Sequence, residues 1–381
     1  MIEKKKILMI FGTRPEAIKM APLFHRLKSD ADLFDVTVCI TAQHREMLDQ
    51  VLEIFQVTPD IDLNIMQKSQ NLFDITTSVL TSMKKILDDT NPDIVLVHGD
   101  TTTTLAASMA CFYSDIKVAH VEAGLRTHNI FAPYPEEFNR QVTSKVAKLH
   151  FAPTEISKKN LIKEGVEEES IFITGNTVID ALFWMLQRIE SDHNISGDIE
   201  KLLNRLIPFN WQSEKFILVT GHRRENFGAG FLQICEALRE LASRFKDIQI
   251  VYPVHLNPNV QSPVNDTLAD LPNIHLIEPL EYESFVYLLK HSFLVLTDSG
   301  GIQEEAPSLG KPVLVMREVT ERPEAVNAGT VELVGADRDK IIEGVTRLLE
   351  DEERYSKMAC SHNPYGDGNA SNHIASILRD I

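Results

Sequence analysis

Short runs of apolar residues recur along the chain and alternate with longer segments whose apolar positions follow a helical spacing. The first half predicts strands at 7–11, 36–41, 94–98, 118–121, 149–152 and 171–174. A second series predicts strands at 216–220, 248–254, 274–277, 293–297, 313–316 and 331–334. The pattern predicts two doubly wound α/β domains, with a ligand site between them at the carboxyl ends of the strands.

The boundary between the two domains is predicted near a helix that joins the two strand series. This helix is expected at 180–190, and a polar stretch at 191–215 follows it. The boundary therefore falls either in that polar stretch or slightly earlier, near Gly175 and Asn176. A short amphipathic helix predicted at 372–379 follows a turn-rich tail and could cap either domain.

Composition and charge exclude several classes of protein. The 381 residues are 43% hydrophobic and 24% charged, as in ordinary globular proteins with more than one core. No stretch approaches the roughly 18 to 20 apolar residues of a membrane span, and the first apolar run is too short for a signal peptide. We therefore expect a cytoplasmic protein that binds no membrane. A formal charge of −17 opposes general binding to nucleic acid, so a polyanionic ligand would need a local cluster of cations.

The cysteines predict no chemistry. They show no CxxC spacing and mostly lie in apolar stretches, so small buried side chains are expected, without disulfides or a metal site. They are Cys39, Cys111, Cys235 and Cys360.

The first predicted strand runs directly into a candidate anion site. Pro15 suits the start of a helix, and Arg14 and Lys19 place two cations near that start. Helix N-termini present N–H groups to phosphates, and a guanidinium can grip a phosphate through two hydrogen bonds. The alternative is that both cations only solvate a loop.

Carboxylates follow successive elements of the first half. Asp100 follows the strand at 94–98, Glu122 follows the next strand, and Glu136 follows Pro135, which suits the first position of a helix. Asp100 could be an ordinary N-cap, and Glu136 could simply favour the helix dipole. Carboxylates crowded together raise at least one pKa, as acid–base catalysis requires, so the group predicts proton transfer.

The second half supplies candidate anion-binding parts. His222 and two arginines follow the strand at 216–220, and phosphate contact or acid catalysis is favoured there over a structural histidine. Ser299, Gly300 and Gly301 form a turn that lets a diphosphate approach backbone N–H groups. Glu305 lies about one turn further and could accept hydrogen bonds from ribose hydroxyls. Other candidates at strand ends are Arg317, Arg322 and His255, the last of which could instead cap its strand.

Taken together, these motifs resemble the non-hydrolysing UDP-N-acetylglucosamine 2-epimerases. In the family's order they are Gly12-Thr13-Arg14-Pro15-Glu16, His98-Gly99-Asp100-Thr101, Val121-Glu122-Ala123-Gly124-Leu125-Arg126, Pro135-Glu136-Glu137-Phe138-Asn139-Arg140, Gly221-His222-Arg223-Arg224-Glu225-Asn226 and Asp298-Ser299-Gly300-Gly301. The resemblance extends to the Gly366-Asp367-Gly368 tail. It implies a glycosyltransferase-B-like fold of two facing Rossmann-like domains with an interdomain active-site cleft. The implied domains are 1–176, joined by a C-terminal helix within 364–381, and 177–363.

The resemblance also implies an activity and the residues that carry it. The activity is interconversion of UDP-N-acetylglucosamine and UDP-N-acetylmannosamine without a metal or other cofactor. The catalytic residues fall on Asp100, Glu122, Glu136 and His222. The nucleotide-sugar contacts fall on Arg14, Lys19, Phe285, Ser299, Gly300, Gly301, Glu305 and Arg322, and His255 is added as a candidate. Leu280 departs from a glutamine that relatives often carry, so any contact there is expected through the backbone.

Further expectations concern regulation and partners. By resemblance, substrate could also bind as an activator at Gln43 and His44, although these residues could simply cap a strand. The expected partners are the two UDP-sugars, UDP and a second copy of the chain in a homodimer. The product could feed a cell-wall or capsular polymer.

The chemistry of the sugar predicts elimination as the route. The C2 proton is not acidic, and no nucleotide fingerprint indicates a bound nicotinamide, so UDP is expected to leave first. A 2-acetamidoglucal then forms, and UDP adds back with C2 inverted. The rivals are a UDP-sugar glycosyltransferase of the same fold, a hydrolysing epimerase and a sensor without turnover. Carboxylates grouped in the first domain favour proton transfer at C2 over a single acceptor base.

Overall fold

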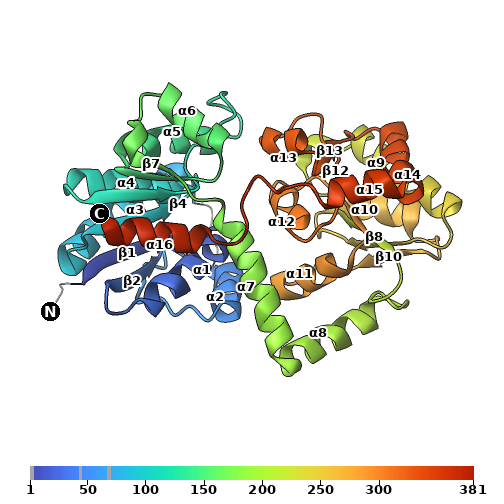
Figure 1. Ribbon diagram of the computed structural model, residues 1–381, viewed down its shortest axis with the longest axis horizontal. Coiled ribbons are helices and arrows are strands. Elements are labelled where there is room, and N and C mark those ends of the chain that lie inside the picture. The colour runs from blue at the N-terminus through green and yellow to red at the C-terminus, as the bar shows by residue number, and fades with distance from the viewer. Residues whose placement is uncertain (1–3, 43–44, 67–69) are drawn as a thin grey trace. The chain divides into compact units, whose positions relative to one another are not determined.

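The computed structural model of the chain describes residues 4–42, 45–66 and 70–381. The chain divides into two compact units (Figure 1). Unit 1 comprises Met1–Trp184 and Tyr365–Ile381, and unit 2 comprises Met185–Pro364. Each unit contains one parallel sheet flanked by helices, which confirms the predicted fold class.

The sheet of unit 1 has the strand order β3-β2-β1-β4-β5-β6-β7 within the described residues. The strands are β1 (Lys5–Phe11), β2 (Phe34–Ile40), β3 (Ile61–Asp62), β4 (Ile94–His98), β5 (Lys117–Val121), β6 (Leu149–Ala152) and β7 (Ile171–Ile173). The apolar runs predicted all of these except β3, whose two residues are too few to form a run. The order reverses between β1 and β4, which is where such sheets bind ligands.

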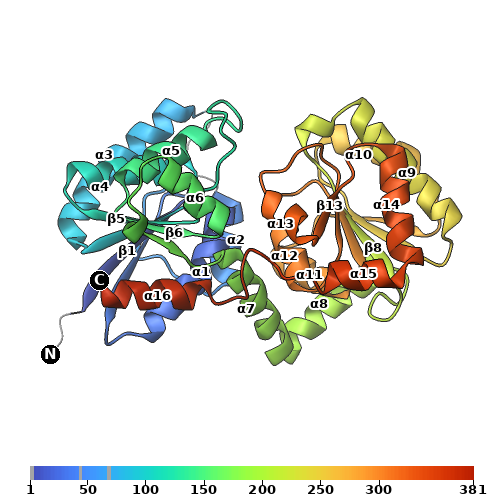
Figure 2. The same ribbon diagram turned by 45° about the horizontal axis from the view of Figure 1, so that its top comes forward.

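Helices cover both faces of this sheet. They are α1 (Arg14–Ser29), α2 (Arg45–Ile54), α3 (Leu72–Thr90), α4 (Thr102–Tyr113), α5 (Glu136–Val146), α6 (Glu155–Lys163), α7 (Thr177–Ser191) and α16 (Ala370–Asp380). Leu8 and Ile10 of β1 share one buried cluster with α3 and α4. Figure 2 shows α3 and α4 on one face of the sheet and α1 and α16 on the other. Successive strand residues point to opposite faces, so β1 contributes to both layers.

The C-terminal helix belongs to unit 1. Asp180 of α7 accepts hydrogen bonds from the first N–H groups of α16, those of Ala370 (3.1 Å) and Ser371 (2.7 Å). Burial raises the pKa of Asp180, and these bonds oppose that rise. The open question of which domain the predicted helix caps is therefore answered: it packs beside α1.

The units divide within α7, between Trp184 and Met185. The sequence left the boundary either in the polar stretch 191–215 or near Gly175 and Asn176, and the resemblance implied the second position. Trp184 is held in unit 1 by ring stacking. Its ring lies 5.2 Å from that of His25 and 5.0 Å from that of Phe55. The first half of α7 is therefore packed into unit 1.

The sheet of unit 2 has the strand order β10-β9-β8-β11-β12-β13. Its strands are β8 (Phe216–Thr220), β9 (Gln249–Pro253), β10 (Ile274–Ile277), β11 (Leu294–Thr297), β12 (Val313–Val315) and β13 (Val331–Leu333). Its helices are α8 (His193–Leu206), α9 (Ala229–Arg244), α10 (Pro258–Leu268), α11 (Tyr282–His291), α12 (Ile302–Ser308), α13 (Pro323–Ala328), α14 (Arg338–Glu350) and α15 (Glu352–Ala359). The core lies where α9, α10 and α14 pack on β8, β9, β11 and β12. Again the order reverses, here between β8 and β11.

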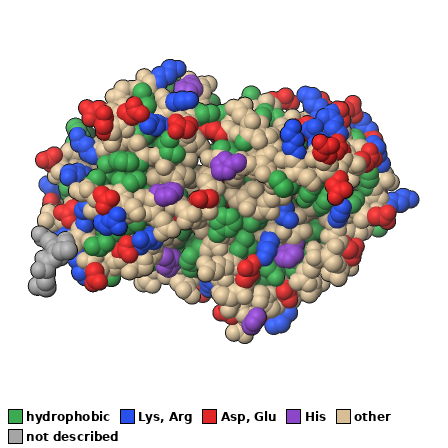
Figure 3. Space-filling model, in the orientation of Figure 1, with side chains coloured by type: hydrophobic (Ala, Val, Ile, Leu, Met, Phe, Trp, Pro, Cys, Tyr) green, Lys and Arg blue, Asp and Glu red, His purple; other side chains and the backbone are tan. Residues whose placement is uncertain are grey.

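The surface carries acidic and basic side chains intermixed on the face drawn in Figure 3. Among the described helices, none is long and apolar enough to cross a membrane. Three of the cysteines are buried as expected, but Cys360 is exposed. The expectation was wrong there because α15 lies at the surface with a largely polar sequence.

Candidate active site

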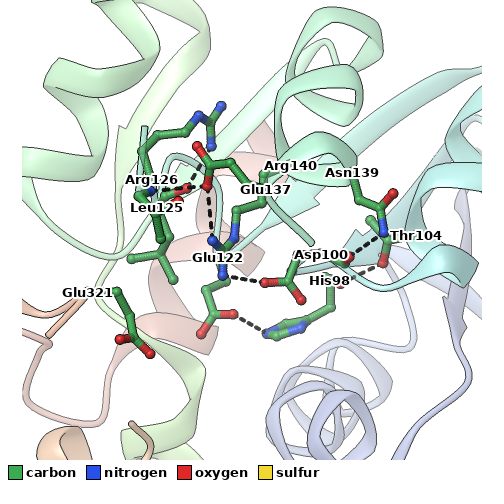
Figure 4. Close-up of polar contacts among 12 residues, drawn as sticks. His98, Asp100, Thr104, Glu122, Leu125, Arg126, Glu137, Asn139, Arg140 and Glu321 are labelled. Carbon is green, nitrogen blue, oxygen red and sulfur yellow. Dashed lines mark hydrogen bonds and ion pairs between the residues drawn. The ribbon is translucent and has the colours of Figure 1, made fainter. Parts of the chain in front are cut away.

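Asp100 follows β4 and Gly99, and it is held by α5. Arg140 Nη2 lies 2.6 Å from Asp100 Oδ2, and Asn139 Nδ2 donates to the Asp100 carbonyl oxygen at 2.8 Å (Figure 4). The N-cap of α4 is Thr101, so the alternative that Asp100 serves as that cap is wrong. Its carboxylate is instead paired with a cation and about a quarter exposed.

Glu122 follows β5 in a strained backbone conformation, with φ of 61°. Its side chain is 8% exposed, and Oε1 accepts hydrogen bonds from Lys19 Nζ and from Asn176 Nδ2, the latter at 2.9 Å. Burial is the largest effect and opposes ionisation, but Lys19, His98 and Asn176 together outweigh it and hold the pKa of Glu122 well below its usual value. Glu122 is therefore a buried but charged carboxylate.

His98, the last residue of β4, faces Glu122. Its buried Nε2 lies 3.9 Å from Glu122 Oε2 and has no hydrogen-bond partner among the described residues (Figure 4). Burial lowers the pKa of His98 to about 4, although Glu122 opposes this shift. The imidazole is therefore neutral at pH 7.

Glu136 is the first residue of α5, and Pro135 occupies the N-cap position. The prediction that Pro135 takes the first helical position was wrong by one residue. Glu136 is half-buried, and its Oε2 is a buried atom without a hydrogen-bond partner among the described residues. An unpaired buried carboxylate oxygen is unusual and fits a reactive group.

Glu137 is fully buried and anchors the loop before α5. It accepts hydrogen bonds from the N–H groups of Thr127 (3.1 Å) and His128 (3.2 Å) and pairs with Arg140 Nη1 at 3.1 Å. Figure 4 shows Arg140 between Glu137 and Asp100. One guanidinium therefore connects this loop to the residue that follows β4.

The predicted anion site at the start of α1 is partly occupied by the protein itself. Glu16 is buried, its pKa is raised by that burial, and its Oε2 accepts the N–H groups of Gly12 (3.0 Å) and Thr13 (2.8 Å). These donors are not open to a phosphate. Arg14 is half-buried and has no ion-pair partner among the described residues, so its guanidinium is the group that could bind an anion.

His222 follows β8 in unit 2, in a turn fixed by Asp298. Asp298 Oδ2 accepts the N–H groups of His222 (2.9 Å) and Arg223 (2.8 Å), and the Asp298 side chain is fully buried. The imidazole of His222 is about half exposed and stacks on that of His255, with 5.1 Å between ring centroids. Burial lowers the pKa of His222, and Asp298 opposes this shift.

The candidate diphosphate turn, Ser299 to Gly301, joins β11 to α12. A side chain at Gly300 would place its Cβ 2.7 Å from Arg322 Nη1, so glycine lets the guanidinium lie against the turn. Arg322 also pairs with Glu304 (2.5 Å) and Glu321 (2.8 Å). The turn and this arginine are therefore in direct proximity.

The arginines of this region are already paired with acids. Arg317 Nε lies 2.6 Å from Glu225 Oε1, and its Nη1 lies 2.7 Å from Glu321 Oε2. Burial opposes ionisation of Glu321, but Arg322 and Arg317 outweigh it and lower its pKa to about 2. The positive charge of these arginines is therefore largely balanced within the protein.

The remaining predicted contacts lie on or just before α11, on α12, or outside the residues that the structure describes. Glu305 Oε1 accepts a hydrogen bond from the Tyr282 hydroxyl at 2.9 Å, and Phe285 is half-buried on α11. Leu280 precedes α11. Gln43 and His44 lie outside the described residues.

Several contacts of the site were missed by sequence reasoning. They involve Asn176, His98, Glu137, Arg140 and the buried Asp298. Only one pair had a signal in the sequence, because Glu137 and Arg140 stand three residues apart on one helix. In the described part of the chain, no group of three or more metal-ligating side chains is found.

Comparisons with known proteins agree with this architecture. The sequence model of the family described as UDP-N-acetylglucosamine 2-epimerase matches residues 25–379. The chain is 58% identical over 375 residues to the UDP-N-acetylglucosamine 2-epimerase of Escherichia coli (strain K12), and 98% of each chain is covered. It is also 58% identical over 374 residues to that of Campylobacter jejuni, covering 98% of this chain and 97% of the relative.

A solved structure matches along the whole chain. The crystal structure of the Neisseria meningitidis UDP-GlcNAc 2-epimerase bound to UDP-GlcNAc has a TM-score of 0.90 and 53% identity, covering 99% of this chain and 100% of that one. Fold and site together define an α/β enzyme of the glycosyltransferase-B-like class, with two Rossmann-like domains. The chain belongs to the UDP-N-acetylglucosamine 2-epimerase family and is therefore an isomerase.

Proposed function

We propose that this enzyme interconverts UDP-N-acetylglucosamine and UDP-N-acetylmannosamine. The observation that carries the proposal is the grouping of Asp100, Glu122 and Glu136 around the carboxyl ends of β4 and β5. Asp100 is tied to α5, which begins with Glu136, and a side chain at the neighbouring Gly99 would place its Cβ 3.3 Å from Glu122 Oε2. A relative with 53% identity binds UDP-GlcNAc, which supports the substrate.

The proposed reaction proceeds by elimination and re-addition. The bond from C1 to the UDP oxygen breaks, a carboxylate takes the C2 proton, and a C1–C2 double bond remains in the 2-acetamidoglucal. A proton is then delivered to the other face of C2 while UDP adds back to C1. Atoms and charge balance without an oxidant. One carboxylate acts as the base that takes a proton from C2, and a protonated carboxyl group acts as the acid that delivers a proton to the other face of C2.

The charged contacts of the site suggest which residues transfer protons and which bind the diphosphate. Lys19 helps to keep Glu122 in its ionised form, and Arg140 fixes the position of the Asp100 carboxylate. We assign proton transfer at C2 to Asp100, Glu122 and Glu136 as a group. We assign the departing diphosphate to Ser299, Gly300, Gly301 and Arg322, with His222 protonating or hydrogen-bonding the phosphate. Preorganised donors of this kind stabilise developing charge by several kcal/mol.

Binding of the remaining parts of the substrate follows the resemblance. Arg14 and Lys19 are proposed contacts from unit 1, and Phe285, Glu305 and His255 from unit 2. Several expectations stay predictions: the cleft between the domains, activation through Gln43 and His44, the homodimer, the cytoplasmic location and the cell-envelope polymer.

Proton NMR of an incubation with UDP-N-acetylglucosamine in heavy water tests the function. Formation of UDP-N-acetylmannosamine with deuterium at C2 in both UDP-sugars supports it. Free N-acetylmannosamine would indicate a hydrolysing epimerase, and turnover only with an added acceptor would indicate a glycosyltransferase. The variants Asp100→Asn, Glu122→Gln and Glu136→Gln should each lose C2 exchange, whereas Glu169→Gln, at an exposed position away from the site, should not.

A further inference from the structure

The chain passes between the units twice, and the two passages meet in unit 1. One passage lies in α7, between Trp184 and Met185, and the other lies between Pro364 and Tyr365. The N–H of Asn176, just before α7, donates to the Tyr365 carbonyl oxygen at 2.7 Å. The returning C-terminal segment is therefore bonded to the start of the outgoing helix.

This contact requires close approach of two backbones. A Cβ on Gly175 would lie 3.2 Å from the Tyr365 oxygen, and one on Gly366 would lie 3.3 Å from the Gly175 Cα. Both glycines have positive φ, 83° and 119°, which side chains disfavour. Glycine at both positions thus lets the tail lie directly on the segment that carries Asn176.

Asn176 also holds the carboxylate of Glu122. Its Nδ2 donates to Glu122 Oε1 at 2.9 Å, and its Oδ1 accepts the N–H of Val178 at 3.2 Å. The residue is only 2% exposed. The amide is therefore fixed at both ends, and Lys19 and Asn176 together orient the Glu122 carboxylate about Oε1.

The tail is anchored on both sides of Asn176. On α7, Asp180 accepts the N–H groups of Ala370 and Ser371. Before Asn176, the Thr174 carbonyl oxygen lies 3.1 Å from His373 Nδ1. A displacement of the tail would therefore move the backbone that carries the Asn176 amide.

We infer that Asn176 is a positioning residue that couples the returning C-terminal segment to the orientation of the Glu122 carboxylate. The inference rests on the proposed function, because it concerns proton transfer by Glu122. It makes the tail from Tyr365 onward a part of the catalytic apparatus through the backbone contact between Tyr365 and Asn176.

The first test replaces the amide. Asn176→Ala removes a hydrogen bond to a charged group while keeping the backbone N–H. The value of kcat and the rate of C2 deuterium exchange should each fall about 10- to 100-fold, with KM little changed. Asn160→Ala is the matched control, since Asn160 Nδ2 donates to the Gly124 carbonyl oxygen at 3.0 Å and touches no carboxylate. Its kcat should stay within about 2-fold of the wild type.

A double-mutant cycle tests the coupling to the tail. Asp180→Asn removes one acceptor for the N-terminus of α16 and should lower kcat about 3- to 10-fold in the wild-type background. In the Asn176→Ala background it should lower kcat no further, because the tail no longer acts on Glu122. Thermal unfolding checks that each variant is folded. If Asp180→Asn does not fold, Gly366→Ala takes its place in the cycle.

The outcomes separate this inference from the proposed function. If Asn176→Ala retains full kcat, or if the two fold-losses multiply, the inference is wrong. If the wild type produces no epimer at all, the proposed function is wrong instead. A change confined to thermal stability, with kcat and C2 exchange intact, would assign Asn176 a purely structural role and would also overturn the inference.

Discussion

Arg140 Nη2 lies 2.6 Å from Asp100 Oδ2, and the same guanidinium reaches Glu137 with Nη1 (Figure 4). Burial lowers the pKa of Arg140, but Asp100 and Glu137 outweigh it and the pKa is raised. The arginine is therefore charged, and its planar fork spans two carboxylates that come from different elements. This geometry makes Arg140 a positioning group for Asp100.

Arg140→Lys should lower kcat about 10-fold, because a single ammonium cannot span both carboxylates in the same geometry. Arg126→Lys is the matched control, since Arg126 is also a buried arginine on a carboxylate, with Nε 2.8 Å from Glu164 Oε1. We expect the control to lower the melting temperature while kcat is retained. Equal kcat losses in the two variants would show that the Asp100 contact has no special role.

Lys19→Met should shift the acidic limb of the kcat/KM profile to higher pH. Without Lys19, burial dominates and the pKa of Glu122 rises, so a higher pH is needed to ionise the carboxylate. The expected shift is about 1 to 3 pH units. Steady-state kinetics across the pH range measure it, and an acidic limb that does not move would contradict the assigned role of Lys19.

Stability should fall as the solution becomes acidic, because of buried neutral histidines. Burial lowers the pKa of His120 to about 3 and that of His150 to about 4. Between those values and the unfolded value of about 6.5, the unfolded chain binds more protons, so the free energy of unfolding falls as pH falls. Each histidine should remove about 2 kcal/mol between about pH 7.5 and about pH 5.

Urea unfolding at the two pH values tests this dependence. His150→Asn should show a smaller loss of stability on acidification than the wild type. His193→Asn changes an exposed histidine at the start of α8 and should leave the pH dependence unaltered. An identical acid-induced loss in all three proteins would be inconsistent with titration of His150.

Asp298→Ala should weaken both the fold and the turn that carries His222. It removes the acceptor of two backbone N–H groups and should lower the free energy of unfolding by about 2 to 3 kcal/mol and kcat by about 10-fold. Asp337→Ala also removes an acceptor of two N–H groups, at the exposed start of α14. That control should cost about 1 kcal/mol and leave kcat unchanged. If the control lost as much activity as Asp298→Ala, the effect could not be assigned to His222.

The sheets were predictable because their strands are short apolar runs, which a buried parallel strand requires. The two-residue β3 carries no such signal. The position of each acid after a strand was also readable, since carboxyl ends of parallel strands meet at one edge. The hydrogen-bond partners of these acids could not be predicted from the sequence. Asn176 and Glu122, for example, stand 54 positions apart, and only the folded backbone brings them together.

The arginines of unit 2 show a second limit of the sequence. Arg317 was named as a candidate anion-binding residue after a strand, and the structure shows that Glu225 and Glu321 pair with it. Those acids belong to segments far apart in the chain or to an irregular loop, so no periodicity joins them. Burial of Asp298 likewise follows from its place at the end of β11, beside the end of β8, which only the strand order reveals.

Glu16 reaches from the first turn of α1 to Thr101 at the start of α4, whose hydroxyl donates to it at 2.6 Å. The strand order reverses between the neighbouring strands β1 and β4. The Glu16 carboxylate therefore connects the loop after β1 to the loop after β4 through hydrogen bonds. The two loops at the carboxyl ends of β1 and β4 are consequently held in a fixed position relative to each other. The loop before α5 is fixed by a separate set of contacts, because Glu137 accepts the N–H groups of Thr127 and His128.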